Sequence, residues 1–178
     1  MALKKFFTPL LFIGNEWITS PVLMKFVEDY CFSYVNNLRI FNVNARTLFN
    51  SVSIYIMPMV NPDGVDLVTG EISPNSSLYT NTKLIADNYP TIPFPSGWKA
   101  NIRGVDLNLQ FPAGWEQARQ IKFEQGFTFP APRDFVGFGP LTEPEALAIY
   151  NFTLEHNFSL ILSYHTQGEV IFWQFQNY

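Results

Sequence analysis

The sequence predicts an α/β layered domain, and two observations carry that prediction. Apolar runs suited to buried strands stand at residues 10–13, 51–57 and 159–164, and segments with helical spacing of apolar residues lie between them. Helices that alternate with buried strands are typical of layered α/β domains. The chain has 178 residues, 47% of them hydrophobic, which is enough for a core of its own. We therefore expect one domain over residues 1–178.

The first predicted strand, Leu10–Ile13, leads into a helix. Thr19-Ser20-Pro21 has the composition of an N-cap followed by a proline in the first turn. Apolar residues then recur at helical spacing, which predicts a helix to about Asn37. Cys31 lies on the apolar face of this helix and is expected to pack in the core. As the chain's single cysteine, it excludes an internal disulfide and a cysteine-rich zinc module.

The middle of the chain predicts one strand and a long irregular region. Ser51–Met57 is an unbroken β-branched run, expected to form a strand buried on both faces. Asn61-Pro62-Asp63-Gly64 has the residues of a tight turn, because proline fixes φ and glycine permits positive φ. Residues 65–138 are rich in Pro, Gly, Asn and aromatic residues, and a loop region of that length tends to be functional.

A second helix and strand complete the pattern. Thr142 is the expected N-cap of a helix that extends to about His156, and Glu145 would complete a capping box. Ser159–Tyr164 is predicted to be a strand ending at His165, and Glu169–Phe175 is a candidate for a further strand.

Composition excludes several classes of function. The formal net charge is −4 and only 15% of residues are charged, so the chain lacks the basic footprint of a nucleic-acid-binding protein. No apolar run reaches the roughly 18 residues of a membrane span. The first residues mimic a signal peptide, but Thr8-Pro9 interrupts the apolar stretch and no small-residue cleavage site follows.

Three polar clusters follow the predicted strands: residues 14–16, 61–64 and 165–168. In open α/β sheets, ligands bind at the carboxyl ends of the strands. The sequence therefore predicts one functional site where these clusters converge.

Six segments in a fixed order resemble the zinc metallocarboxypeptidase family, the carboxypeptidase A-like peptidases. Within it they are most similar to the bacterial branch that cuts the γ-D-glutamyl–diaminopimelate bond of peptidoglycan peptides. The segments are GNEWITSPVLMKF, MPMVNPDGVDL, WKANIRGVDLN, FPAGWE, RDFVGFGPLTEPEA and SYHTQGEVIFW. The resemblance implies a three-layer α/β/α sandwich with a mixed, mostly parallel sheet, of which this chain forms part.

The resemblance also implies a zinc site. Family members hold zinc with a His-x-x-Glu motif and a distant His. Here Glu16 matches the Glu and His165 the distant His, but Ile13 stands where the first His is expected. Because a catalytic zinc keeps three protein ligands and a water, two ligands predict weak zinc binding or none.

Two further residues match substrate-contacting positions of the family. Arg103 resembles the cation that polarises the scissile carbonyl and steadies the oxyanion, and Asn108 resembles the substrate-contacting Asn. The next position, where the family carries an arginine that grips a terminal carboxylate, holds Leu109. Leucine cannot form that charged, bidentate hydrogen bond, so recognition of a free C-terminal carboxylate is not expected.

The family's general-base Glu and mobile Tyr normally lie well downstream of the distant His, and neither has a counterpart before Tyr178. We therefore expect a truncated copy of the family domain. The function implied is zinc-dependent hydrolysis of a cell-wall peptide. The alternative is a catalytically inactive protein that binds peptides or depends on a partner. The resemblance implies a bacterial source; the sequence does not define the compartment, and we expect the cytoplasm, with a secreted or cell-wall location as the alternative.

Each residue has a purely structural alternative. Glu16 could favour a helix N-terminus and His165 could be an ordinary histidine at a strand end. Arg103 could simply pair with Asp106. The aromatic residues of the C-terminal segment are expected in the core or at an interface: Phe172, Trp173 and Phe175.

Overall fold

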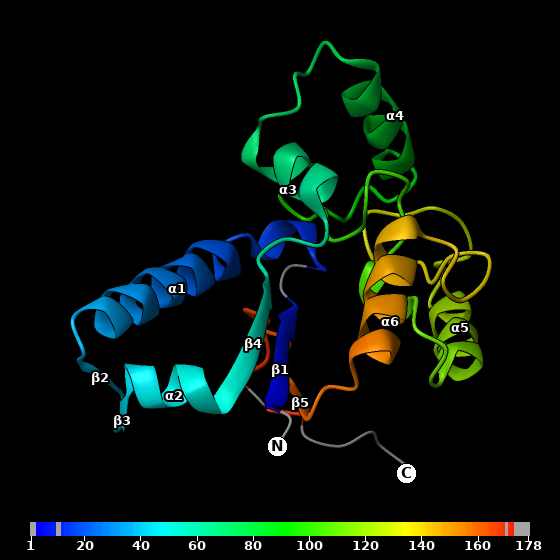
Figure 1. The fold of residues 1–178 in the computed structure, drawn as a ribbon. Helices are drawn as coiled ribbons and strands as arrows, with labels where there is room; N and C mark the ends of the chain where they lie inside the picture. Colours follow the sequence, from blue (N-terminus) through cyan, green and yellow to red (C-terminus); the bar gives the residue numbers. More distant parts are fainter. Residues whose placement is uncertain (1–2, 10–11, 170, 173–178) are drawn as a thin grey trace.

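The computed structural model describes residues 3–9, 12–169 and 171–172. Its centre is a parallel sheet with the strand order β4-β1-β5 (Figure 1). The strands are β1 (Lys4–Pro9), β4 (Val52–Met57) and β5 (Leu160–Ile161). In the register, Phe6 of β1 lies opposite Ile54 of β4 and Leu160 of β5. Because all three strands are parallel, their carboxyl ends meet at one edge of the sheet.

Helices cover both faces of this sheet, so the predicted three-layer α/β/α arrangement is confirmed (Figure 1). On one face, α1 (Thr19–Val35) packs Leu23 and Phe26 against Ile56 of β4. On the other face, α6 (Pro144–His156) contributes Ile149 and Phe152 to a cluster around Phe7 of β1. Side chains alternate between the faces of a strand, which explains why neighbouring residues of β1 face different helices.

Smaller elements connect α1 to β4. The antiparallel pair β2 (Arg39–Ile40) and β3 (Val43–Asn44) leads into α2 (Ala45–Ser51). Asn44 caps α2, since its side chain accepts hydrogen bonds from the backbone N–H groups of Arg46 and Thr47.

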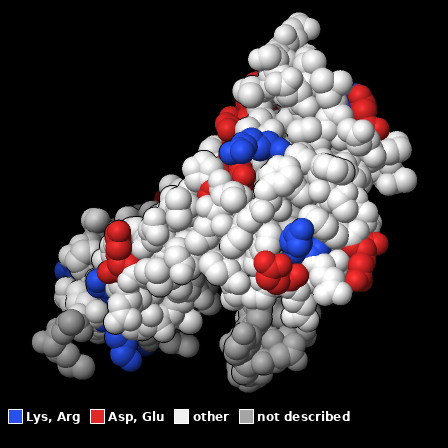
Figure 2. Space-filling view, turned by 90° about the vertical axis from the view of Figure 1, so that its right-hand side faces the viewer, with Lys and Arg blue, Asp and Glu red and all other residues white. Residues whose placement is uncertain are grey.

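Uncharged residues cover most of the face shown in Figure 2, and Lys and Arg lie there beside Asp and Glu.

The prediction of a long irregular region over residues 65–138 is wrong, because several short helices interrupt it. They are α3 (Pro62–Thr69), α4 (Ser77–Ala86), the 3-10 helix η2 (Leu107–Leu109) and α5 (Trp115–Glu124). The expected turn at residues 61–64 is the start of α3, with Asn61 as its N-cap and Pro62 in its first turn. The signals of a turn and of a helix start share these residue types, which explains the error.

The predicted strands shift or shorten. The first strand precedes the expected Leu10–Ile13, of which residues 10–11 lie outside the described part and residues 12–13 are not in a strand. The segment Ser159–Tyr164 forms only the two-residue β5. Trp173 and Phe175 lie outside the described residues, and Phe172 is exposed.

Three smaller predictions are also wrong. Thr19 is the first residue of α1 and not its cap, and its hydroxyl donates to the Glu16 carbonyl at 3.1 Å. Glu143, not Thr142, is the N-cap of α6, because Gln110 engages both the backbone N–H and the hydroxyl of Thr142. Cys31 is exposed and does not pack in the core.

Candidate functional site

The short 3-10 helix η1 (Gly14–Glu16) presents the first residue of the site. The Gly14 N–H donates to the Lys99 carbonyl at 3.1 Å, which fixes the start of the turn. A Cβ added to Gly14 would lie 2.8 Å from the carbonyl oxygen of Gly64 in α3, so only glycine permits this close approach. Glu16 then directs its carboxylate inward, where the residue is only 3% exposed.

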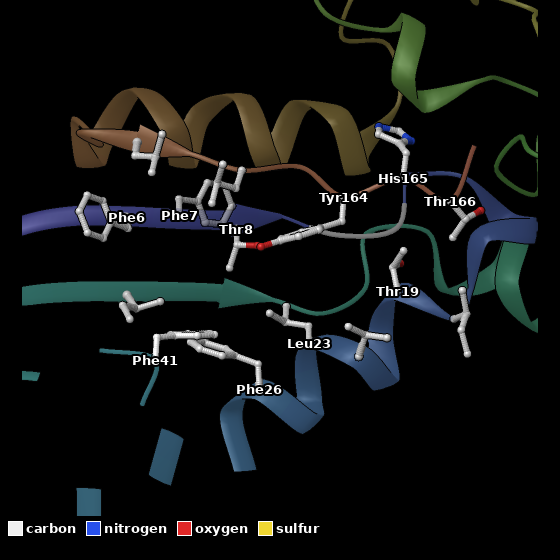
Figure 3. Close-up of a pocket in the computed structure, with 15 residues that line it drawn as sticks. Phe6, Phe7, Thr8, Thr19, Leu23, Phe26, Phe41, Tyr164, His165 and Thr166 are labelled. Carbon is white, nitrogen blue, oxygen red and sulfur yellow. The ribbon is translucent and has the colours of Figure 1, made fainter. Parts of the chain in front are cut away.

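The segment after β5 delivers the second residue, His165. Since β1 and β5 are parallel neighbours, the chain leaves both strands at the same edge of the sheet. The His165 side chain points away from the ring of Tyr164, which reaches into the pocket toward Thr8 (Figure 3). The structure thus brings residues 16 and 165 together, as the sequence predicts.

Glu16 and His165 are in direct contact although 149 residues separate them. His165 Nδ1 lies 3.1 Å from Glu16 Oε2, and the Thr166 N–H donates to the same oxygen at 3.1 Å. Lys99 Nζ lies 3.9 Å from Glu16 Oε1. Burial alone would raise the pKa of the Glu16 carboxyl, but the hydrogen bonds with His165 and Thr166, and after them the electrostatic effects of His165 and of Lys99, outweigh it and lower that pKa. Glu16 is therefore ionised at neutral pH, and its carboxylate accepts the Thr166 N–H beside the contact with His165 Nδ1.

Lys99 belongs to the site but was not predicted, whereas Thr166 and Gln167 lie in the predicted polar cluster of residues 165–168. Lys99 donates a hydrogen bond of 2.6 Å to the side-chain oxygen of Gln167, so it joins the segment after β5 to the chain before η2. Lys99 lies four residues before Arg103 in the same matching segment. The local sequence presents two cations there and gives no indication of which one is buried.

Arg103 and Asn108 lie elsewhere in the same region. Arg103 is exposed, and its guanidinium lies 3.6 Å from the buried Glu143 carboxylate. It does not form the alternative pair with Asp106, whose carboxylate instead accepts the backbone N–H groups of Asn108 and Asp134. Asn108 is exposed on η2. Among the described residues, the cation that contacts Glu16 is thus Lys99 and not Arg103.

The side chains present do not fit a zinc site with three protein ligands. Glu16 and His165 supply one carboxylate and one imidazole. The third position holds Ile13, which is 7% exposed and packs with Phe7 and Phe12 in the apolar core. In the described part of the chain, no group of three or more His, Cys, Asp or Glu residues is placed to hold a metal ion. His156 lies apart, at the end of α6.

A family model for zinc carboxypeptidases matches residues 12–178. The chain belongs to the zinc carboxypeptidase family. It is 46% identical, over 93% of its length, to gamma-D-glutamyl-L-diamino acid endopeptidase 1 of Lysinibacillus sphaericus, of which it covers 40%. It is 41% identical, over 98% of its length, to the uncharacterized protein YqgT of Bacillus subtilis, of which it covers 45%. The chain therefore spans less than half the length of these two relatives.

More distant relatives agree with this placement. Carboxypeptidase O of Bos taurus is 27% identical over 89% of this chain, which covers 36% of that protein. The crystal structure of thrombin activatable fibrinolysis inhibitor (TAFI) superposes with a TM-score of 0.61, at 20% identity, over 92% of this chain and 35% of that one. That likeness shows the carboxypeptidase fold. No helix of the described residues is long and apolar enough to cross a membrane.

Proposed function

We propose that this chain is a peptidase domain of the zinc carboxypeptidase family that acts on γ-D-glutamyl–diamino acid peptides, such as those of bacterial cell walls. The observation that supports the proposal is the contact between Glu16 and His165, the two residues that we assign to ion-binding positions of the family, at the carboxyl edge of the sheet. The similarity to an endopeptidase named for this bond supports the choice of substrate.

The residues assigned to substrate contact are suited to bind an amide within a peptide and not a free C-terminal carboxylate. Asn108 and Arg103 are exposed, and both are available to a bound peptide. Leu109, beside Asn108, offers no charged group for a terminal carboxylate. We therefore expect hydrogen bonds from Asn108 and Arg103 to substrate, without a carboxylate clamp.

The family is zinc-dependent, and we propose that zinc binding by this chain is weak. The buried Ile13 removes one ligand and fills its place with apolar atoms. A second candidate function follows from the same residue: the chain binds γ-D-glutamyl peptides without cleaving them. We propose a cytoplasmic location in a bacterium; a secreted or cell-wall location is the alternative, and cell fractionation distinguishes the two.

The test is to restore the missing ligand with Ile13→His. We expect zinc affinity, measured by isothermal titration, to rise by about two orders of magnitude or more over the wild type, because a third protein ligand completes the set. Turnover of a γ-D-glutamyl–diaminopimelate peptide by the zinc-loaded variant then separates the candidates. Cleavage supports the peptidase, and peptide binding without cleavage supports the second function.

A control variant excludes zinc capture by any newly buried histidine. Ile40→His places an imidazole at another buried apolar position, in β2, and is expected to leave zinc affinity unchanged. Equal affinity gains in the Ile13→His and Ile40→His variants, or no gain in either, would show that the ion-binding pair has been assigned wrongly.

A further inference from the structure

Both the side chain and the backbone of Lys99 form hydrogen bonds that fix this residue at the site. Its side chain is only 8% exposed, and its Nζ donates to Gln167 Oε1 at 2.6 Å. Its carbonyl accepts the Gly14 N–H at 3.1 Å, and its own N–H donates to the Pro132 carbonyl at 2.7 Å. The ammonium group therefore has a fixed position beside Glu16.

A buried ammonium group requires a compensating charge, and Glu16 supplies one. The distance of 3.9 Å between Lys99 Nζ and Glu16 Oε1 is that of an ion pair without a hydrogen bond. The carboxylate is instead oriented by His165 Nδ1 and the Thr166 N–H. Lys99 thus acts on Glu16 through its charge, whereas His165 and Thr166 hold the carboxylate in position.

The charge of Lys99 lies beside the carboxylate that a divalent ion at this site would need. An ion bound to Glu16 would share that carboxylate with the ammonium, in a region of low exposure where like charges are poorly screened. Each cation would lower the affinity of the site for the other.

We propose that Lys99 is an internal counter-ion that neutralises Glu16 in place of a metal ion and opposes the binding of one. The inference rests on the proposed function, because it takes Glu16 and His165 as the ion-binding pair. Ile13 and Lys99 are then two separate obstacles: one withholds a ligand and the other repels the ion. Removing both is expected to restore more affinity than removing either.

The test uses zinc titrations in the Ile13→His background, where binding is strong enough to measure. Adding Lys99→Met is expected to tighten zinc binding at least about tenfold, because the repulsion is removed while the two hydrogen bonds to Glu16 remain. Lys99→Gln, which keeps a donor for Gln167, is expected to do the same. Lys99→Arg keeps the charge and is expected to bind like its parent.

Lys122→Met is the matched control. Lys122 also forms a partly buried ion pair, with Asp134 Oδ1 at 2.6 Å, and its loss changes the net charge by the same amount. It is expected to leave zinc affinity unchanged. If the Lys122→Met variant gains as much affinity as the Lys99 variants do, the effect is one of net charge and the inference fails.

Thermal unfolding without zinc gives a second readout. Lys99→Met and Lys99→Gln leave the buried Glu16 without its cation, so both are expected to lower the melting temperature, and saturating zinc should recover the loss in the Ile13→His background. Unchanged zinc affinity in both Lys99 variants overturns the counter-ion role while the proposed function stands. If Ile13→His itself gains no affinity, both proposals fall.

Discussion

Among single residues, Ile13 has the largest effect on what the site can bind. It is part of the core cluster that contains Phe7, Phe12 and Val60, so the site and the core share this side chain. Histidine at position 13 exchanges apolar contacts for a polar ring whose nitrogen a bound ion would satisfy. Zinc should therefore stabilise Ile13→His far more than it stabilises the wild type.

Asn61 is a second residue on which the site depends. It is fully buried, and its side-chain nitrogen donates to the carbonyls of Phe12 and Ala100 at 3.1 and 3.0 Å. Its side-chain oxygen accepts the Gly64 N–H at 3.0 Å, which caps α3. One side chain thus joins the segment before η1, the start of α3 and the segment after Lys99.

We predict that Asn61→Ala lowers the free energy of unfolding by about 3 kcal/mol, since it removes a cap and leaves two buried carbonyls without a donor. Urea denaturation measures the change. Asn44→Ala, at the half-buried cap of α2, removes that cap and one side-chain hydrogen bond to Asn37, leaves no buried carbonyl without a donor, and should cost about 1 kcal/mol. Equal losses in the two variants would show that the two carbonyl contacts of Asn61 contribute nothing.

At the scale of elements, Asp134 links α5 to the loop that precedes α6. Its carboxylate accepts hydrogen bonds from Lys122 Nζ at 2.6 Å and Arg133 Nε at 2.7 Å. Burial alone would raise the pKa of Asp134, but these two hydrogen bonds and charges outweigh it and lower that pKa. The ionised carboxylate consequently stabilises the folded chain.

We predict that Asp134→Asn costs about 2 kcal/mol at pH 7 and that this difference from the wild type closes in acid. A carboxyl group with a lowered pKa stabilises the fold above its unfolded pKa of about 3.9, and the contribution is lost as the pH falls through the lower folded value. Urea denaturation between pH 7 and pH 3 measures both variants.

Asparagine also tolerates the positive φ of 68° at position 134, so the backbone should be retained. Asp29→Asn, in the exposed pair with Lys25 on α1, serves as the control and should show no measurable change. A difference between wild type and Asp134→Asn that persists undiminished at pH 3 would contradict the assignment to ionisation.

Elements with strong periodicity were predictable, and those set by tertiary contacts were not. Apolar spacing in α1, the polar residues expected to cap α6 and the β-branched residues of β4 located these elements to within a few residues. β1 begins with Lys4 and Lys5, which read locally as a charged leader. The short helices α3 to α5 carry many residues typical of loops and gain stability from packing, which local propensity does not reveal.

The residues of the site likewise divide into those that the sequence predicted and one that depends on tertiary contacts. The positions of Glu16 and His165 came from ordered motifs and from the rule that parallel strands end together. The role of Lys99 depends on burial and on a contact with Gln167, 68 residues later in the chain. Nothing in the local sequence distinguishes that lysine from the exposed Arg103.

At the scale of the whole molecule, an apolar groove lies between α1 and the sheet, with a volume of about 550 Å³ (Figure 3). Phe6, Ile54 and Leu160 line its sheet side, and Val22 and Phe26 line its helix side. Parallel sheets are normally covered on both faces, so this groove is an unusually open part of the fold.

We predict that the native chain binds the apolar dye 8-anilinonaphthalene-1-sulfonate in this groove. Val22→Glu should abolish most of the dye fluorescence, because it places a carboxylate on the helix side of the groove. Val22 is 64% exposed, so the free energy of unfolding should change by no more than about 0.5 kcal/mol.

Val35→Glu is the matched control. Val35 is 69% exposed on the same helix but does not line the groove, so this variant should retain the fluorescence of the wild type. Loss of fluorescence in both variants would place the dye elsewhere.

The shortness of β5 has one more consequence. Two backbone hydrogen bonds that flank it, from Ser159 to Lys5 and from Leu162 to Phe7, fasten this edge of the sheet, and its side chains are exposed. A ligand that needs both Glu16 and His165 can bind only while these hydrogen bonds hold the β5 segment against β1. The apparent dissociation constant of that ligand is therefore the intrinsic value divided by the fraction of molecules in which β5 is paired with β1. A substitution that stabilises this pairing would lower the apparent dissociation constant without altering a coordinating atom.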